Sequence, residues 1–151
     1  MQQVFWIDPR DKGAFLVAVM RQLSGDDASM ELEINAEDMA AFDFKLIPGL
    51  LNLEVVGNPA AKAVVFPLTS DTIRPILDQL LPEGRFVHRV GAIQIQKAGE
   101  LQLLVGDNFH RECVSSWPAI REEFLQDLAR RGIIRSFKPD SVARGWKQGR
   151  S

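Results

Sequence analysis

The pattern of hydrophobic and polar positions predicts strands and helices in turn along the chain. Residues 4–7 form a short apolar run, which indicates a buried strand. Asp8 then matches a helix N-cap, with Pro9 at the first helical position. The helix that follows is predicted to end at Gly25. Its apolar face comprises Phe15, Leu16, Val19, Met20 and Leu23.

A period-two pattern predicts the next strand. Met30, Leu32 and Ile34 alternate with Glu31 and Glu33. Successive side chains of a strand point to opposite faces of a sheet. We therefore expect both glutamates on the face opposite the apolar side chains.

The middle of the chain predicts one short helix, two strands and a longer helix. The short helix is capped by Asn35 and runs to residue 42. Residues 50–56 and 63–68 are expected to be strands, because Gly-Asn-Pro between them is turn chemistry. The longer helix covers residues 72–81, with Pro75 tolerated in its first turn.

The second half predicts a hairpin and a final helix. Strands over residues 86–96 and 101–105 flank a turn at residues 97–100. Ser115 or Ser116 precedes the last helix, whose apolar face comprises Ile120, Phe124, Leu125 and Leu128.

The final helix also has a clear end. Arg130 and Arg131 fit its last turn, where cations complement the helix dipole, and Gly132 closes it. Residues 133–137 predict a last strand, and residues 138–151 form a polar, basic tail.

Together these elements predict one α+β (or mixed α/β) domain over residues 1–137. Because hairpins impose antiparallel neighbours, we expect a largely antiparallel sheet of about six or seven strands with three main helices. The 151 residues are enough for one domain with a substantial core. A single cysteine excludes an internal disulfide.

A faint internal similarity runs through this arrangement. Residues 51–58 resemble residues 101–108, and each segment is followed by a helix, a glycine and a strand. The spacing of about 50 residues is within the range of repeat architectures. Duplication and chance similarity both remain open as explanations.

Charge is distributed unevenly. The chain has 20 acidic and 18 basic residues, yet residues 26–44 contain acids without a single lysine or arginine. Such a block creates a negative field that can steer a basic partner, or it simply solvates one face. The predicted partner-binding residues are Asp26, Asp27, Glu31, Glu33, Glu37 and Asp38.

The most reactive cluster lies after the second hairpin strand. His110 and Cys113 share a face if this segment is helical, and Asp107 or Glu112 could orient the imidazole. The alternative is that Cys113 is a small buried apolar residue. One cysteine and two histidines do not make a structural zinc site, and no nucleotide-binding motif occurs.

These observations favour a noncatalytic protein-binding domain with an acidic face, such as an immunity-type inhibitor of a basic toxin or nuclease. The first alternative is a small enzyme that uses the Cys113 and His110 pair, and the second is a scaffold subunit of a larger assembly. We expect a basic protein partner, no cofactor, no metal and no nucleic acid. No apolar run is long enough to span a bilayer, and no secretory signal is evident, so we expect a cytoplasmic protein.

Overall fold

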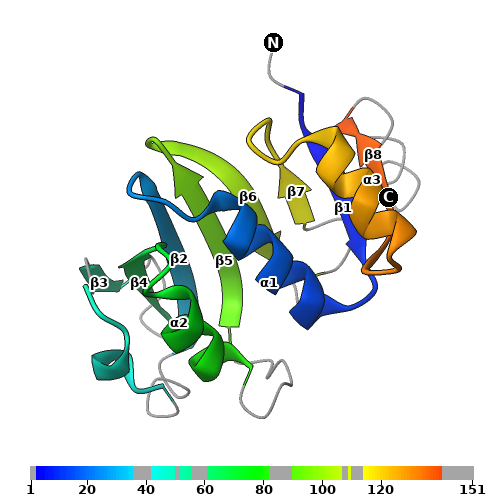
Figure 1. The fold of residues 1–151 in the computed structure, drawn as a ribbon. Helices are drawn as coiled ribbons and strands as arrows, with labels where there is room; N and C mark the ends of the chain where they lie inside the picture. The colour runs from blue at the N-terminus through cyan, green and yellow to red at the C-terminus, as the bar shows by residue number, and fades with distance from the viewer. Residues whose placement is uncertain are drawn as a thin grey trace.

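Apolar residues at intervals of two, and of three to four, form the strands and helices in the computed structural model of this protein (Figure 1). The structure describes residues 3–35, 42–49, 52–55, 61–81, 90–106, 109 and 114–140. The strands are β1 (Phe5–Pro9), β2 (Ala28–Asn35), β3 (Asn52–Val55), β4 (Ala61–Pro67), β5 (Val90–Lys97), β6 (Glu100–Gly106), β7 (Val114–Ser116) and β8 (Ile134–Pro139). The helices are α1 (Lys12–Leu23), α2 (Ile73–Leu80) and α3 (Glu122–Arg130), with a 3-10 helix at Phe44–Leu46.

The strands form one sheet in the order β3-β4-β2-β5-β6-β7-β1-β8. Every neighbouring pair is antiparallel. The predicted fold class, a single α+β domain with an antiparallel sheet and three main helices, is confirmed. The described residues contribute eight strands, and the short β7 is the one that the sequence pattern did not predict.

The three helices cover one face of the sheet (Figure 1). Cross-strand partners share a face, so the registers trace the residues that lie beneath the helices. One such row, all of it buried, comprises Phe66, Met30, Ile95, Leu103, Ser116 and Phe5. No described helix lies over the opposite face, and the core therefore sits between the sheet and a single helical layer.

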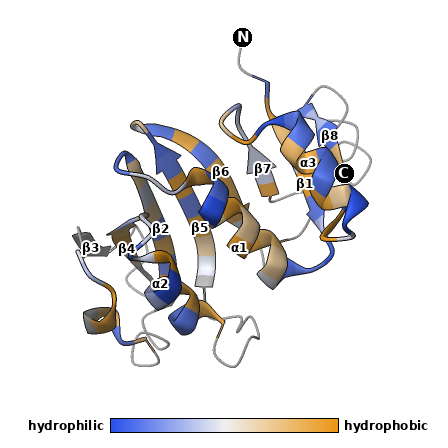
Figure 2. Ribbon diagram, in the orientation of Figure 1, coloured by the Kyte–Doolittle hydropathy of each residue, from blue (hydrophilic) through white to orange (hydrophobic). Residues whose placement is uncertain are grey.

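The alternation predicted for β2 is confirmed. Met30, Leu32 and Ile34 are buried, whereas Glu31 and Glu33 are half-buried on the opposite face, over which no described helix lies. Figure 2 shows this change of hydropathy along the strand. The predicted apolar face of α1 is also buried in full.

The β5–β6 hairpin forms at the predicted turn. Ala98 and Gly99 are its two loop residues, and both have positive φ values, +53° and +78°. Two left-handed residues are the signature of a type I′ turn, whose twist matches that of the flanking strands. Lys97 and Glu100 are paired at the ends of the two strands.

The predicted start of the first helix is wrong by three residues. Asp8 and Pro9 belong to β1 and pair with β8. The N-cap is Asp11, whose carboxylate accepts a hydrogen bond from the Ala14 backbone N–H at 3.0 Å. Asp8 and Pro9 belong to the strand rather than to the helix, because the pairing with β8 continues through both residues and Pro9 is buried there.

The prediction that the last helix begins just after Ser115 or Ser116 is also wrong. Both serines are buried in β7, which lies between β6 and β1. The helix begins at Glu122, after Arg121, which makes no side-chain cap. Gln102 shapes the intervening loop, since its side-chain oxygen accepts a hydrogen bond from the Ala119 N–H at 2.9 Å.

The end of α3 agrees with the prediction at its glycine. Gly132 has a φ of +76°, and the Ile133 N–H donates to the Leu128 carbonyl at 2.9 Å. These features match a left-handed helix C-cap. Arg130 lies in the last turn, but Arg131 is already the C-cap. The strand that follows, β8, continues through Pro139.

A threonine fixes the start of α2. Thr72 is buried, and its hydroxyl donates to the Pro67 carbonyl at 2.6 Å and accepts from the Thr69 N–H at 2.9 Å. Thr72 thereby ties the end of β4 to the start of the helix. Pro75 lies in the first turn of α2, as predicted.

Several predicted segments lie outside the described residues. They are most of the short helix, residues 36–41, the turn at residues 57–59 and the first part of the strand predicted over residues 86–96. The tail beyond residue 140 lies outside them as well.

The sheet consists of two halves with the same topology. One half has the order β3-β4-β2-β5, with α2 before its last strand, and the other has the order β6-β7-β1-β8, with α3 before its last strand. In each half, the strand in third position comes first along the chain. The sequence similarity between residues 51–58 and 101–108 falls on β3 and β6, the equivalent first positions. The common topology is what a duplication would produce, and a shared ancestry stays a prediction.

Candidate functional site

The four residues of the predicted catalytic cluster lie outside the described part of the chain. They are Asp107, His110, Glu112 and Cys113. Of this segment only Phe109 is described. It is buried against Phe15, with the ring centroids 6.3 Å apart in an edge-to-face arrangement. The catalytic hypothesis for these four residues stays a prediction.

The predicted acidic residues are only partly described. Asp26 and Asp27 are exposed in the turn between α1 and β2, while Glu37 and Asp38 lie outside the described residues. The Asp27 carboxylate lies 3.5 Å from the Lys97 ammonium group. Asp27 is therefore partly neutralised by its own chain.

Glu31 and Glu33 differ from Asp27 in this respect. Within the described ranges, neither glutamate forms an ion pair. Their spacing of two residues places the two Cα atoms about 7 Å apart along one strand. Because β2 lies between β4 and β5, the two carboxylates stand near the middle of the uncovered half-sheet.

The cross-strand neighbours of the two glutamates carry no charge. Glu31 is flanked by Val65 and Gln94. Glu33 is flanked by Ala63 and Ala92, which are too small to cover it.

One row of side chains crosses the uncovered face from β4 to β8. In register, it comprises Val65, Glu31, Gln94, Leu104, Ser115, Trp6 and Lys138. Ser115 is buried, and the other six are half-buried. The indole N–H of Trp6 donates to the Asp140 carboxylate at 2.8 Å, which anchors the residue that follows β8. The row is acidic at β2, mixed in the middle and basic at β8. We call this surface the open sheet face.

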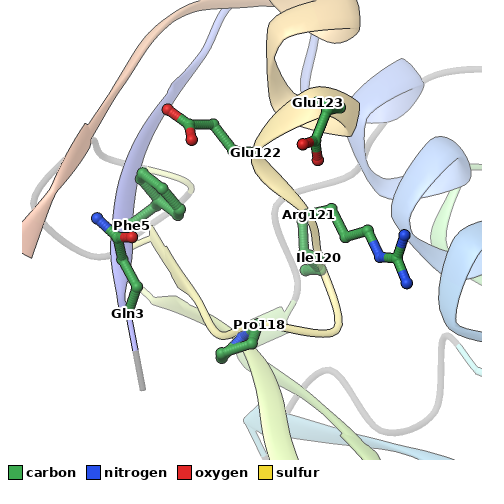
Figure 3. A pocket seen from close by; sticks show the side chains of 7 residues that line it. All are labelled: Gln3, Phe5, Pro118, Ile120, Arg121, Glu122 and Glu123. Carbon is green, nitrogen blue, oxygen red and sulfur yellow. The ribbon is translucent and has the colours of Figure 1, made fainter. Parts of the chain in front are cut away.

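A small hollow lies on the other side of the molecule, between the start of β1 and the start of α3. Figure 3 shows Glu122 on the side of Gln3 and Phe5, whereas Arg121 points away from them. The volume of this hollow is about 210 Å³. This is below the roughly 300 Å³ at which small-molecule pockets begin. The hollow can take little more than a single side chain.

A larger groove, of about 450 Å³, lies between α1 and α3. Its apolar lining comprises Ala14, Val17, Ala18, Phe124 and Ile133. Arg21 and Arg131 also line it. We call this feature the α1–α3 groove.

Among the described residues, one carboxyl beside this groove, that of Asp127, has a shifted pKa. The hydrogen bond from Arg130 lowers the pKa of Asp127, and a second hydrogen bond from Arg131 adds to the effect. The distances from Asp127 to the two guanidinium groups are 2.9 and 3.4 Å. One carboxylate therefore pairs with two guanidinium groups, and these three side chains carry a net positive charge at this end of the groove.

Sequence reasoning identified the glutamates of the open sheet face but missed the other residues of both surfaces. Gln94 became a neighbour of Glu31, and Leu104 and Trp6 joined the same row two and four strands away, only through strand pairing between distant segments. The groove had a signal, because residues 13–20 of α1 are apolar without interruption. One helix face cannot bury eight consecutive residues against a sheet.

Comparison of the chain with family models, with curated proteins and with solved structures finds no match in any of the three. Within the part of the chain that is described, no three His, Cys, Asp or Glu side chains are grouped so that they could hold a metal ion. Among the same residues, no helix has both the length and the apolar character needed to cross a membrane.

Proposed function

We propose that this protein is a noncatalytic protein-binding domain whose open sheet face engages a basic partner. The carrying observation is the position of Glu31 and Glu33. They are half-buried, share one face of a central strand and have no ion pair among the described residues. A partner that supplies cations would give these carboxylates the counter-charges that the described residues do not supply.

The surroundings of the glutamates support recognition of a protein rather than of a free ion. Val65 offers apolar contact area directly beside Glu31. Leu104 and Trp6 extend the apolar area along the same row, two and four strands from Glu31. Gln94 offers both hydrogen-bond donors and acceptors. A mixed surface with aromatic and aliphatic side chains near its charges is typical of protein interfaces.

We propose that the partner is a basic toxin or nuclease and that the domain acts as its immunity-type inhibitor. Carboxylates can occupy the positions at which such an enzyme holds phosphate groups. Opposite charges also speed the encounter of two proteins, which an inhibitor of a toxin requires.

An oligolysine peptide tests the electrostatic part of this proposal. We expect it to bind the wild-type protein at low ionic strength and to bind the Glu31→Lys, Glu33→Lys variant about tenfold more weakly. This estimate takes roughly 0.5–1 kcal/mol for each reversed charge. Isothermal titration calorimetry gives the affinities, and thermal unfolding checks that the variant is folded.

The matched control is Glu122→Lys with Glu123→Lys. It makes the same change of net charge on the helical side, where both glutamates are exposed. The proposal predicts that the control binds the peptide within about twofold of the wild type. Equal weakening by both variants would reduce the effect to net charge, and unchanged binding by the first variant would remove the open sheet face from the mechanism.

A further inference from the structure

We propose that the α1–α3 groove is a second docking site, which binds a partner helix with an apolar face and acidic residues near both ends. This site is on the opposite side of the molecule from the open sheet face and selects the opposite charge. It does not depend on the function proposed above.

Helix α1 carries more apolar residues than its buried face requires. One face of the helix already packs against the sheet. Ala14, Val17 and Ala18 continue the apolar surface on the side toward α3. All three are only half-buried. Figure 2 shows the continuous hydrophobic character along the middle of this helix. A helix that is apolar on more than one side is normally covered on more than one side.

The shape of the groove also fits a bound helix. Phe124 and Ile133 close its far wall, and its volume of about 450 Å³ falls within the range of ligand sites, roughly 300–1,000 Å³. Along α1 the lining extends from Ala14 to Gln22. This span corresponds to about 12 Å, or roughly two helical turns. A partner helix would place apolar anchors at positions i, i+3 or i+4, and i+7 over this length.

Charge complementarity identifies the ends of the partner. Arg21 forms no ion pair within the described ranges. Arg131 shares its single carboxylate, Asp127, with Arg130. The Ile133 carbonyl accepts hydrogen bonds from the chain just before α1, so Arg131 lies near the start of α1, whereas Arg21 lies in its last turn. The cations thus flank the apolar lining, and carboxylates near both ends of a bound helix would pair with them.

Two designed peptides of about 15 residues test this site. Both carry leucines at the anchor positions, one has glutamates near its ends, and the other has lysines there. We expect the acidic peptide to shift the NMR signals of Val17, Ala18 and Ile133 in a saturable way. We expect the basic peptide to bind about tenfold more weakly, because two attractive pairs become repulsive.

Charge reversal provides the decisive comparison. Arg21→Glu with Arg131→Glu should reverse the preference between the two peptides. Arg74→Glu with Arg135→Glu makes the same change of net charge outside the groove and should leave the preference intact. Glu31→Lys with Glu33→Lys should also leave it intact, which separates this site from the proposed function.

Three results would overturn the proposal. They are an absence of saturable shifts at the groove, equal binding of the acidic and basic peptides, and shifts at the groove that depend on protein concentration without any peptide. The last result would make a second copy of this chain the occupant.

Discussion

The β5–β6 hairpin gives the most quantitative test of the structure, because substitutions at its two loop residues should change stability in opposite directions. Ala98 and Gly99 both adopt left-handed backbone angles. Alanine is strained in this region and glycine is not. We therefore predict opposite effects for Ala98→Gly and Gly99→Ala on the free energy of unfolding.

The magnitudes follow from two terms. The left-handed conformation costs a residue with a Cβ about 1–2 kcal/mol relative to glycine. A change from alanine to glycine costs about 0.4–1 kcal/mol through the greater freedom of the unfolded chain. Ala98→Gly should therefore stabilise the protein by about 0.5–1 kcal/mol, and Gly99→Ala should destabilise it by a similar amount. No atom lies within 4 Å of a Cβ built on Gly99, so no clash adds to the second value.

Urea denaturation measures both effects as shifts of the midpoint at constant m-value. The double exchange, Ala98→Gly with Gly99→Ala, tests whether the two effects add. If they do, its free energy of unfolding should lie within about 0.5 kcal/mol of the wild type. Two single variants with the same sign would refute the type I′ geometry of this hairpin. A large loss in the double variant would refute the simple sum of the two terms.

Three further predictions concern single side chains. Thr72→Val should lower the free energy of unfolding by about 1–3 kcal/mol, because two backbone groups lose their buried partner, whereas Thr72→Ser should retain most of it; denaturation of both variants checks this. Ser116→Ala should leave stability unchanged or raise it by up to about 1 kcal/mol in the same assay, because the buried hydroxyl has no hydrogen-bond partner among the described residues. A clear loss would show that this hydroxyl is satisfied. The folded state lowers the pKa of Asp127, chiefly through Arg130, so its stabilising effect is present above the unfolded pKa and is lost as the pH falls through the folded value. As the pH falls below about 4, stability should therefore decrease slightly more steeply in the wild type than in Asp127→Asn.

Local pattern was sufficient for elements whose residues carry a clear period. The strand β2 and the buried face of α1 were predicted correctly because alternation and helical spacing are properties of the segment itself. The short strand β7 has no such period in Val-Ser-Ser, and it exists because β6 and β1 pair with it from both sides. The first helix was predicted to begin too early for the same reason, since pairing with β8 extends β1 through Pro9.

The candidate surfaces divide in the same way. The common face of Glu31 and Glu33 followed from their spacing along one strand. Their neighbours could not be predicted, because Gln94 and Val65 reach them through registers set by distant pairings. The α1–α3 groove likewise depends on where α3 settles on the sheet, and the sequence alone contained only the long apolar run of α1.

The most direct test of the central claim is to locate a basic ligand on one face of the sheet. An oligolysine peptide with a nitroxide spin label would be added to the isotope-labelled protein, and the broadening of NMR signals measured. We predict strong broadening of the Val65 methyl groups and the Gln94 side-chain amide, with Val17 on the helical side unaffected. Broadening that is greatest at Val17, or equal on the two faces, would contradict the assignment of the open sheet face as the binding surface.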